Sequence, residues 1–214
     1  MASPTDDMRM AVVREFMVKS QIEVRGVSDP RVLAAMRRVP RHSFVPQDFL
    51  IQAHEDHPLP LGLGQTISQP YIVAYMAEQI VLRGHERVLE VGSGCGYMAA
   101  VLSLLAKEVY GIELEKELRD RAQAILQGLG YDNIQLLCGD GAQGWQAKAP
   151  FDAIVVSCAA DRIPDPLLDQ LVEGGRIILP LGTPYGHQEL VVVTKAPDGL
   201  EMRSLGAVAF VPLR

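Results

Sequence analysis

The sequence has few cysteines and contains neither a long apolar run nor a recognisable export signal. Its three cysteines, Cys95, Cys138 and Cys158, form neither a Cys-x-x-Cys pair nor an even-numbered set. That usage indicates a reducing compartment and no structural zinc. No apolar stretch approaches the length of a membrane span. Residues 1–7 are polar and acidic rather than basic and then apolar, unlike a signal peptide. We therefore expect a soluble, cytoplasmic protein that does not associate with membranes.

Positive charge is also in deficit, with 20 lysines and arginines against 26 aspartates and glutamates and a formal net charge of -6. A phosphate backbone is normally bound by a basic face, so this composition argues against a nucleic acid as substrate or partner. One local basic run consists of Arg31, Arg37, Arg38 and Arg41. We interpret it as the solvated side of a helix, which is the usual place for such runs.

The chain is long enough for one domain with a complete core. It has 214 residues, of which 48% are hydrophobic and 21% charged, as in ordinary globular proteins. The first part predicts helices joined by loops that contain several prolines. The expected helices cover 7–24, 31–39 and 70–82, the second opened by Asp29-Pro30. We expect 1–84 to form a helical cap, packed as one compact unit with 85–214.

From residue 85 onward, apolar strands alternate with helices. Strands are expected at 87–91, 108–112, 134–138, 151–157 and 176–180, the last after a Gly174-Gly175 turn, and helices at 97–106, 115–129 and 164–171. Such alternation predicts βαβ units around a parallel sheet. Asp198-Gly199 lies between two further apolar segments, 189–194 and 202–210, which predicts an antiparallel hairpin. The fold class is therefore α/β, with a Rossmann-like, doubly wound, mostly parallel sheet, a helical N-terminal cap and a C-terminal antiparallel hairpin.

The turn after the first expected strand is rich in glycine and follows Glu90. Gly92, Gly94 and Gly96 allow the backbone to turn sharply and to pass close to a ligand. A merely tight turn is the simpler alternative. A dinucleotide site would require its third glycine at Tyr97, and a P-loop would require a lysine. The turn therefore favours a ligand without phosphates, such as S-adenosyl-L-methionine, and we assign Glu90 and the three glycines to that cofactor.

Two acidic residues at the ends of the next strands complete the expected cofactor site. Glu113 follows the turn by about 20 residues, the spacing of acidic ribose ligands. Its alternative role is to cap the following helix. Asp140, followed by Gly141, is placed to accept a hydrogen bond from the adenine amino group. Taken alone it is better explained by local turn chemistry, and the glycine turn and Glu113 together favour the cofactor role. We assign Glu113, Asp140 and Gly141 to cofactor binding.

The sequence also bears on which atom is methylated. Amino-group methyltransferases often carry Asp/Asn-Pro-Pro-aromatic after the fourth strand, where this chain has 157–160, Ser-Cys-Ala-Ala. A carboxylate acceptor is already ionised at neutral pH and requires no general base, so orientation does most of the catalysis. His54 and His57 flank two acidic residues, but they lack a complete ligand set, and we interpret them as ordinary loop residues rather than a metal site.

Several segments together resemble protein-L-isoaspartate O-methyltransferases over nearly the whole chain. The segment 64–70, Gly-Gln-Thr-Ile-Ser-Gln-Pro, is the most specific of them. The others are 18–22, 29–33, 39–46, 56–60, 92–96, 139–141, 149–152, 168–176, 188–190 and 210–213. The resemblance implies transfer of a methyl group from S-adenosyl-L-methionine to the free α-carboxylate of L-isoaspartyl residues in damaged proteins, with S-adenosyl-L-homocysteine as the other product.

In that family the serine that matches Ser68 is assigned to the active site, and the neighbourhood of Thr66 lines it. Both hydroxyls can donate hydrogen bonds that orient a carboxylate oxygen. From the pattern alone, a cap for the helix that starts at Pro70 is the favoured role of Ser68, and the resemblance reverses that preference. The expected partners are age-damaged proteins and peptides, and the expected state is a monomer.

The chain departs from the family pattern at Met98, Gly111 and Arg162. If the loop around Arg162 lines the acceptor pocket, its charge would alter the peptide preference. Two alternative functions therefore remain open at this point: a carboxylate methyltransferase with one dedicated peptide or small-molecule substrate, and a noncatalytic module that binds the cofactor.

Overall fold

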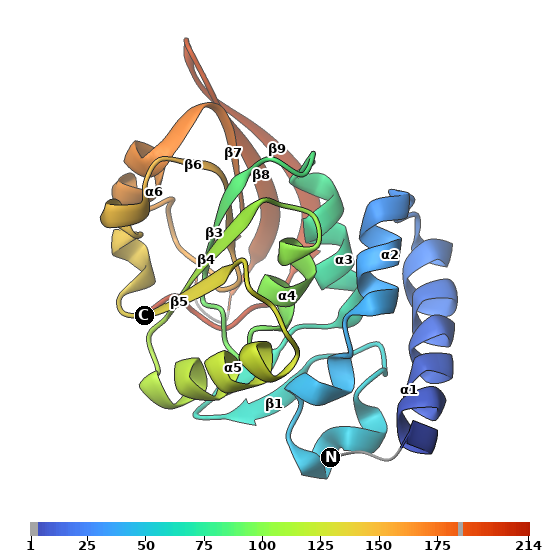
Figure 1. Ribbon diagram of the computed structural model, residues 1–214. Helices are drawn as coiled ribbons and strands as arrows, with labels where there is room; N and C mark the ends of the chain where they lie inside the picture. The colour runs from blue at the N-terminus through green and yellow to red at the C-terminus, as the bar shows by residue number, and fades with distance from the viewer. Residues whose placement is uncertain (1–3, 184–185) are drawn as a thin grey trace.

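The structure is a computed structural model that describes residues 4–183 and 186–214, and a seven-stranded sheet lies at its centre (Figure 1). The strand order is β5-β4-β3-β6-β7-β8-β9. The strands are β3 (Arg87–Val91), β4 (Glu108–Glu113), β5 (Ile134–Cys138), β6 (Phe151–Val156), β7 (Leu171–Gly182), β8 (Gln188–Ala196) and β9 (Gly199–Val208). The sheet is parallel from β5 to β7, whereas β8 and β9 are antiparallel. The predicted fold class is confirmed.

Helices cover both faces of this sheet. The α-helices are α1 (Pro4–Met17), α2 (Pro30–Arg38), α3 (Pro70–Gln79), α4 (Tyr97–Ser103), α5 (Lys116–Gly128) and α6 (Asp165–Gln170). Short 3-10 turns are η2 (Glu23–Arg25), η3 (Arg41–Phe44), η4 (Gln47–Gln52), η5 (Gly141–Gln143) and η6 (Gln146–Lys148), and η1 (Val18–Ile22) is a π-helical turn.

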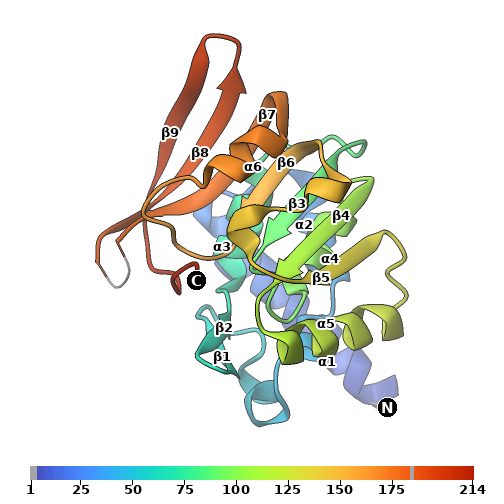
Figure 2. The ribbon, with the colours of Figure 1, turned by 90° about the vertical axis from the view of Figure 1, so that its left-hand side faces the viewer.

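Side chains of β3 alternate between the two layers, as the period of two in a strand requires. Val88 packs with buried residues of α2, α3 and α4, whereas Leu89 and Val91 pack in a second cluster that includes Leu167 of α6. The first cluster joins residues of the cap, such as Met17, to residues of the core. Because β3 to β7 are parallel, their carboxyl ends meet at one edge of the sheet. The strands β1 and β2 lie beyond that edge (Figure 2).

Local signals explain where α2 begins. The Asp29 side chain accepts a hydrogen bond from the Arg31 backbone N–H at 2.8 Å, and Pro30 occupies the first turn. The helix expected at 7–24 is only partly α-helical. The α-helix α1 ends at Met17, and the chain then forms the π-helical turn η1 and the 3-10 turn η2. There the Ser20 hydroxyl donates to the carbonyl of Phe16 at 2.7 Å, a bond that competes with regular helix geometry.

The sequence did not reveal a two-stranded hairpin formed by β1 (Leu59–Gly62) and β2 (Gln65–Ile67). The prolines of this region suggested an extended connection, but proline is allowed on the edge of so short a hairpin. The Gly174-Gly175 turn expected before a strand lies inside β7 instead. Gly174 has a φ of 77°, and the pairing of β6 with β7 shifts register in this part.

Candidate active site

The glycine turn links the end of β3 to the start of α4. Gly92, Gly94 and Gly96 all have positive φ, at 79°, 53° and 86°. At Gly96 a side chain would also be crowded, because a Cβ atom there would lie 3.0 Å from Leu126 Cδ1. The residues predicted for the turn therefore form the sharp, close-packed connection that their spacing suggested.

Glu113 is held against this turn by backbone groups. Its Oε2 accepts a hydrogen bond from the N–H of Gly94 at 2.7 Å, and its Oε1 accepts one from the N–H of Glu115 at 3.0 Å. Glu115 is the N-cap of α5, so Glu113 also supports the start of that helix, as the alternative reading suggested. Since each carboxylate oxygen can accept more than one hydrogen bond, both oxygens retain acceptor capacity.

Glu90 lies deeper, in the middle of the sheet. It is paired with Gly111 on one side and Val155 on the other, and both of its oxygens lie buried without a hydrogen-bond partner among the described residues. Burial raises the pKa of Glu90 to about 8, and the charge of Glu113 acts in the same direction. A cationic group brought close to Glu90 would therefore favour its ionised form.

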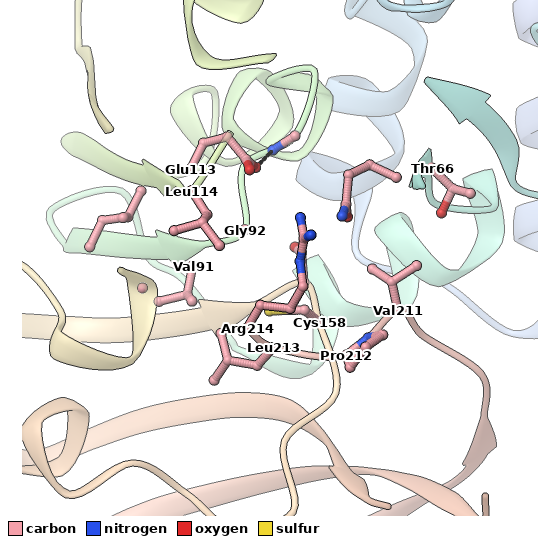
Figure 3. A pocket seen from close by; sticks show the side chains of 15 residues that line it. Thr66, Val91, Gly92, Glu113, Leu114, Cys158, Val211, Pro212, Leu213 and Arg214 are labelled. Atoms are coloured by element: carbon pink, nitrogen blue, oxygen red, sulfur yellow. Dashed lines mark hydrogen bonds between the residues drawn. The ribbon is translucent and has the colours of Figure 1, made fainter. Parts of the chain in front are cut away.

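A cavity of about 50 Å³ lies between the glycine turn and the end of the chain (Figure 3). It is lined by Gln65, Thr66, Val91, Gly92, Gly94, Ile112, Glu113, Leu114, Gly141, Ser157, Cys158, Val211, Pro212, Leu213 and Arg214. Glu113 and Leu114 lie on one side of it, and Thr66 and Val211 on the other (Figure 3). This cavity therefore brings together most of the residues predicted for the cofactor with one predicted for catalysis.

Residues 211–214 line this cavity as well, although none of them was predicted as a site residue. The N–H of Ala159 donates to the carbonyl of Val211 at 2.8 Å, and the N–H of Leu213 donates to the carbonyl of Ala159 at 2.7 Å. Arg214 Nη2 donates to Glu115 Oε1 at 2.7 Å. These contacts join residues far apart in the chain, and the only signal in the sequence was the family-like segment 210–213.

Asp140 and Gly141 follow β5. Asp140 Oδ1 accepts a hydrogen bond from the Ala142 N–H at 2.8 Å, which is the local turn chemistry considered above. Asp140 lines a neighbouring cavity of about 460 Å³, which shares Leu213 and Arg214 with the cavity beside the glycine turn. Gly141 packs so tightly that a Cβ atom would lie 2.4 Å from Val91 Cγ1.

Thr66 lines two cavities, the one beside the glycine turn and a larger one of about 620 Å³. Ser68 and Gln69 line the larger cavity as well. The alternative role of Ser68 as a helix cap is wrong, because the N-cap of α3 is Gln69 and no side chain caps this helix. The two residues predicted for catalysis thus lie on the wall of one cavity.

Arg162 lies on the 460 Å³ cavity beside Asp140 and Asp161, not on the cavity that Ser68 lines. Ser157, at the start of the same loop, does line the cavity that Ser68 lines, so an effect of Arg162 on the peptide preference stays a prediction. Within the described ranges, no group of three or more histidine, cysteine or acidic residues is arranged to hold a metal ion. In the same ranges, no helix is long and apolar enough to cross a membrane.

The residues around the turn fit S-adenosyl-L-methionine. Glu113 offers acceptors for a ribose diol, and the turn brings backbone rather than bulky side chains to the ligand. Glu90 precedes Gly92 by two positions in the chain, and its carboxyl group is buried without a hydrogen-bond partner among the described residues. A doubly wound sheet with these groups at its carboxyl edge defines the class of S-adenosylmethionine-dependent methyltransferases.

Comparisons with known proteins place the chain more narrowly. The family model described as "Protein-L-isoaspartate(D-aspartate) O-methyltransferase" matches residues 13–214, and the chain belongs to this family. A protein-L-isoaspartate O-methyltransferase 2 of Shewanella sediminis (strain HAW-EB3) is 53% identical over 213 residues, which cover 99% of this chain and 87% of the relative. Another from Anaeromyxobacter sp. (strain Fw109-5) is 57% identical over 201 residues, covering 94% and 83%.

Solved structures agree with this placement. One named protein-L-isoaspartate O-methyltransferase has a TM-score of 0.85 and 30% identity, and the match covers 93% of this chain but 65% of that chain. A second, from Plasmodium falciparum, is described as a complex of such an enzyme with S-adenosyl-L-homocysteine. It has a TM-score of 0.81 and 25% identity, covering 94% of this chain and 98% of that chain.

Proposed function

We propose that this protein transfers a methyl group from S-adenosyl-L-methionine to the free α-carboxylate of L-isoaspartyl residues in damaged proteins. The backbone nitrogen of the following residue then attacks the ester and displaces methanol, which forms a succinimide whose hydrolysis restores part of the normal aspartyl linkages. Family membership supports this proposal, and one observation carries it at the level of the site. Thr66 lines both the cavity beside the glycine turn and the 620 Å³ cavity that Ser68 lines.

The proposed cofactor residues are Glu90, Gly92, Gly94, Gly96, Glu113, Asp140 and Gly141. When bound, the cofactor supplies an electrophilic methyl group on its sulfonium. Glu113 holds the ribose, with its carboxylate oriented by the N–H groups of Gly94 and Glu115. Asp140, already fixed by the N–H of Ala142, accepts from the adenine amino group.

The proposed catalytic residues are Ser68 and Thr66, and their role is orientation. The acceptor carboxylate is ionised at neutral pH and attacks without losing a proton, so no side chain has to act as a base. A hydroxyl that donates to one carboxylate oxygen leaves the other free to face the methyl group. Catalysis then rests on proximity and alignment.

The deciding experiment compares two synthetic peptides that differ only in an isoaspartyl or a normal aspartyl linkage. With S-adenosyl-L-methionine labelled in its methyl group, the isoaspartyl peptide should gain label that is released as methanol at alkaline pH, and the aspartyl peptide should gain none. Equal labelling of both peptides, or none while cofactor binding is demonstrated by calorimetry, would contradict the proposal.

We further propose that the protein acts as a cytoplasmic monomer that binds neither nucleic acid nor membrane. The net charge of -6 supports the exclusion of nucleic acid, the scattered cysteines support a reducing compartment, and the lack of a long apolar stretch in the sequence supports the exclusion of a membrane. Sedimentation velocity at micromolar concentration should give one species of the monomer mass, 23.4 kDa. A larger species would contradict the monomer.

A further inference from the structure

Arg41 begins η3 (Arg41–Phe44), and its whole residue is 0% exposed. Its interpretation as part of a solvated basic run is therefore wrong, because Arg41 is fully buried within the helical cap. Its Nε donates to the carbonyl of Ala53 at 2.8 Å, and its Nη2 donates to the carbonyl of Ser68 at 2.8 Å. One rigid guanidinium thus joins two segments that are separate in the sequence.

The same guanidinium reaches the cofactor side of the molecule. Its central carbon lies 4.8 Å from the ring centroid of Tyr97, the first residue of α4, which directly follows Gly96 of the glycine turn. Arg41 therefore lies between the acceptor-side segment that carries Ser68 and the turn assigned to the cofactor. The contact with the ring is a cation–π interaction in a buried setting, where such contacts are strongest.

Packing alone is a poor explanation for this side chain. Over the residues that the structure covers, no carboxylate forms an ion pair with Arg41, and its Nη1 is buried without a partner. A buried cation without a counter-ion is costly, and an apolar side chain of similar volume would fill the same space at less cost. The fork of donors is what an apolar side chain could not supply.

We propose that Arg41 is a positioning residue for methyl transfer, which fixes Ser68 relative to the glycine turn. This inference rests on the proposed function. Arg41 acts through Ser68, whose carbonyl it holds, and not on the substrate itself. Because transfer depends on aligning an acceptor oxygen with the methyl group, a small displacement of Ser68 lowers the rate of the chemical step more than it weakens cofactor binding.

The first test is the Arg41→Lys variant, which keeps the charge but cannot donate to both carbonyl groups with one rigid fork. We expect kcat for the isoaspartyl peptide to fall about 10- to 100-fold. The Kd of S-adenosyl-L-homocysteine, measured by calorimetry, should stay within about twofold. Arg41→Gln should show the same loss, and because it removes the buried charge it does not depend on burying an ammonium group.

A matched control separates positioning from loss of stability. Val32 of α2 is 2% exposed and contacts neither cavity of the site, so Val32→Ala should lower Tm while leaving kcat within about twofold. In the Ser68→Ala background, Arg41→Lys should lower kcat by less than about twofold further, because the group that it positions has already been removed.

Several outcomes would overturn the inference. These are an unchanged kcat in folded Arg41→Lys, a loss that multiplies fully with that of Ser68→Ala, a loss matched by Val32→Ala, or failure of both Arg41 variants to fold as judged by circular dichroism. Each indicates a structural role or none. Failure of the unaltered protein to label the isoaspartyl peptide would instead contradict the proposed function, so the two can be distinguished.

Discussion

The carboxylate of Glu113 accepts a hydrogen bond from the backbone N–H of Gly94, with 2.7 Å between the two atoms. This bond connects the end of β4 to the turn after β3, so the acidic group and the turn form one rigid unit. The unit is the part of the site most suited to binding a ligand through its sugar.

Replacing Glu113 by glutamine should weaken cofactor binding. The amide keeps the shape of the side chain but loses the charge that strengthens its hydrogen bonds, so the Kd of S-adenosyl-L-homocysteine should rise about 10- to 100-fold. Calorimetry measures the change directly. Glu117→Gln, on the exposed surface of α5, serves as the control and should bind normally. Equal affinities in the two variants would remove Glu113 from the cofactor site.

Gly141→Ala should destabilise the protein by about 1–3 kcal/mol, because its Cβ atom would lie 2.4 Å from Val91 Cγ1. Gly139→Ala is a matched control, since its Cβ atom would meet nothing closer than 3.9 Å. Urea denaturation gives both free energies of unfolding. Adding Val91→Ala to the Gly141 variant should recover part of the loss, and additive losses would show that the Gly141–Val91 contact is not the cause.

The free energy of unfolding should decrease in acid because His54 is held neutral in the folded protein. Burial lowers the pKa of His54 to about 4, and the neighbouring charges of His42, Arg14 and Arg41 act in the same direction. The unfolded chain therefore binds the additional proton between pH 6.5 and about 4, so the free energy of unfolding decreases as pH falls through that window, by at most about 1.4 kcal/mol per pH unit.

His54→Gln should flatten this part of the stability profile, measured by urea denaturation at a series of pH values. The exposed His85 provides the control, and His85→Gln should leave the slope unchanged. An unaltered slope in His54→Gln would show that His54 is protonated as easily in the folded protein as in the unfolded chain.

Glu90 should change the free energy of unfolding with pH in the opposite sense to His54. Burial raises its pKa to about 8, so the folded protein holds a proton on Glu90 that the unfolded chain releases above pH 4.5. Its contribution therefore makes the free energy of unfolding decrease as pH rises from 4.5 to about 8. Glu90→Gln, which remains neutral throughout, should remove that decrease. A profile between pH 6.5 and 8 identical to that of the unaltered protein would count against a protonated Glu90.

Much of the fold was predictable because its signals are local. The alternation of strands and helices, the Asp29 cap of α2 and the glycine turn each depend on neighbouring residues, and the structure confirms all three. The position of Glu113 beside the glycine turn was also predictable, since it ends a strand that lies next to the turn-bearing strand in the sheet, whereas its role toward the cofactor stays a prediction. In each case short-range geometry and the rule for parallel sheets are sufficient.

The features that escaped prediction arise from contacts between distant segments. The burial of Arg41 depends on carbonyl groups of Ala53 and Ser68, and a run of arginines gives no sign of them. The hairpin of β1 and β2 is too short for a periodic pattern. The closing of the cavity by Val211–Arg214 likewise depends on the position of Ala159.

This last arrangement has a consequence for how the protein is made. Gly92 and Glu113 leave the ribosome well before Val211 and Arg214, which line the same cavity. A nascent chain that already contains the glycine turn therefore still lacks one side of the pocket. Cofactor binding that uses both sides of this pocket can therefore stabilise the fold only after Arg214 has been translated.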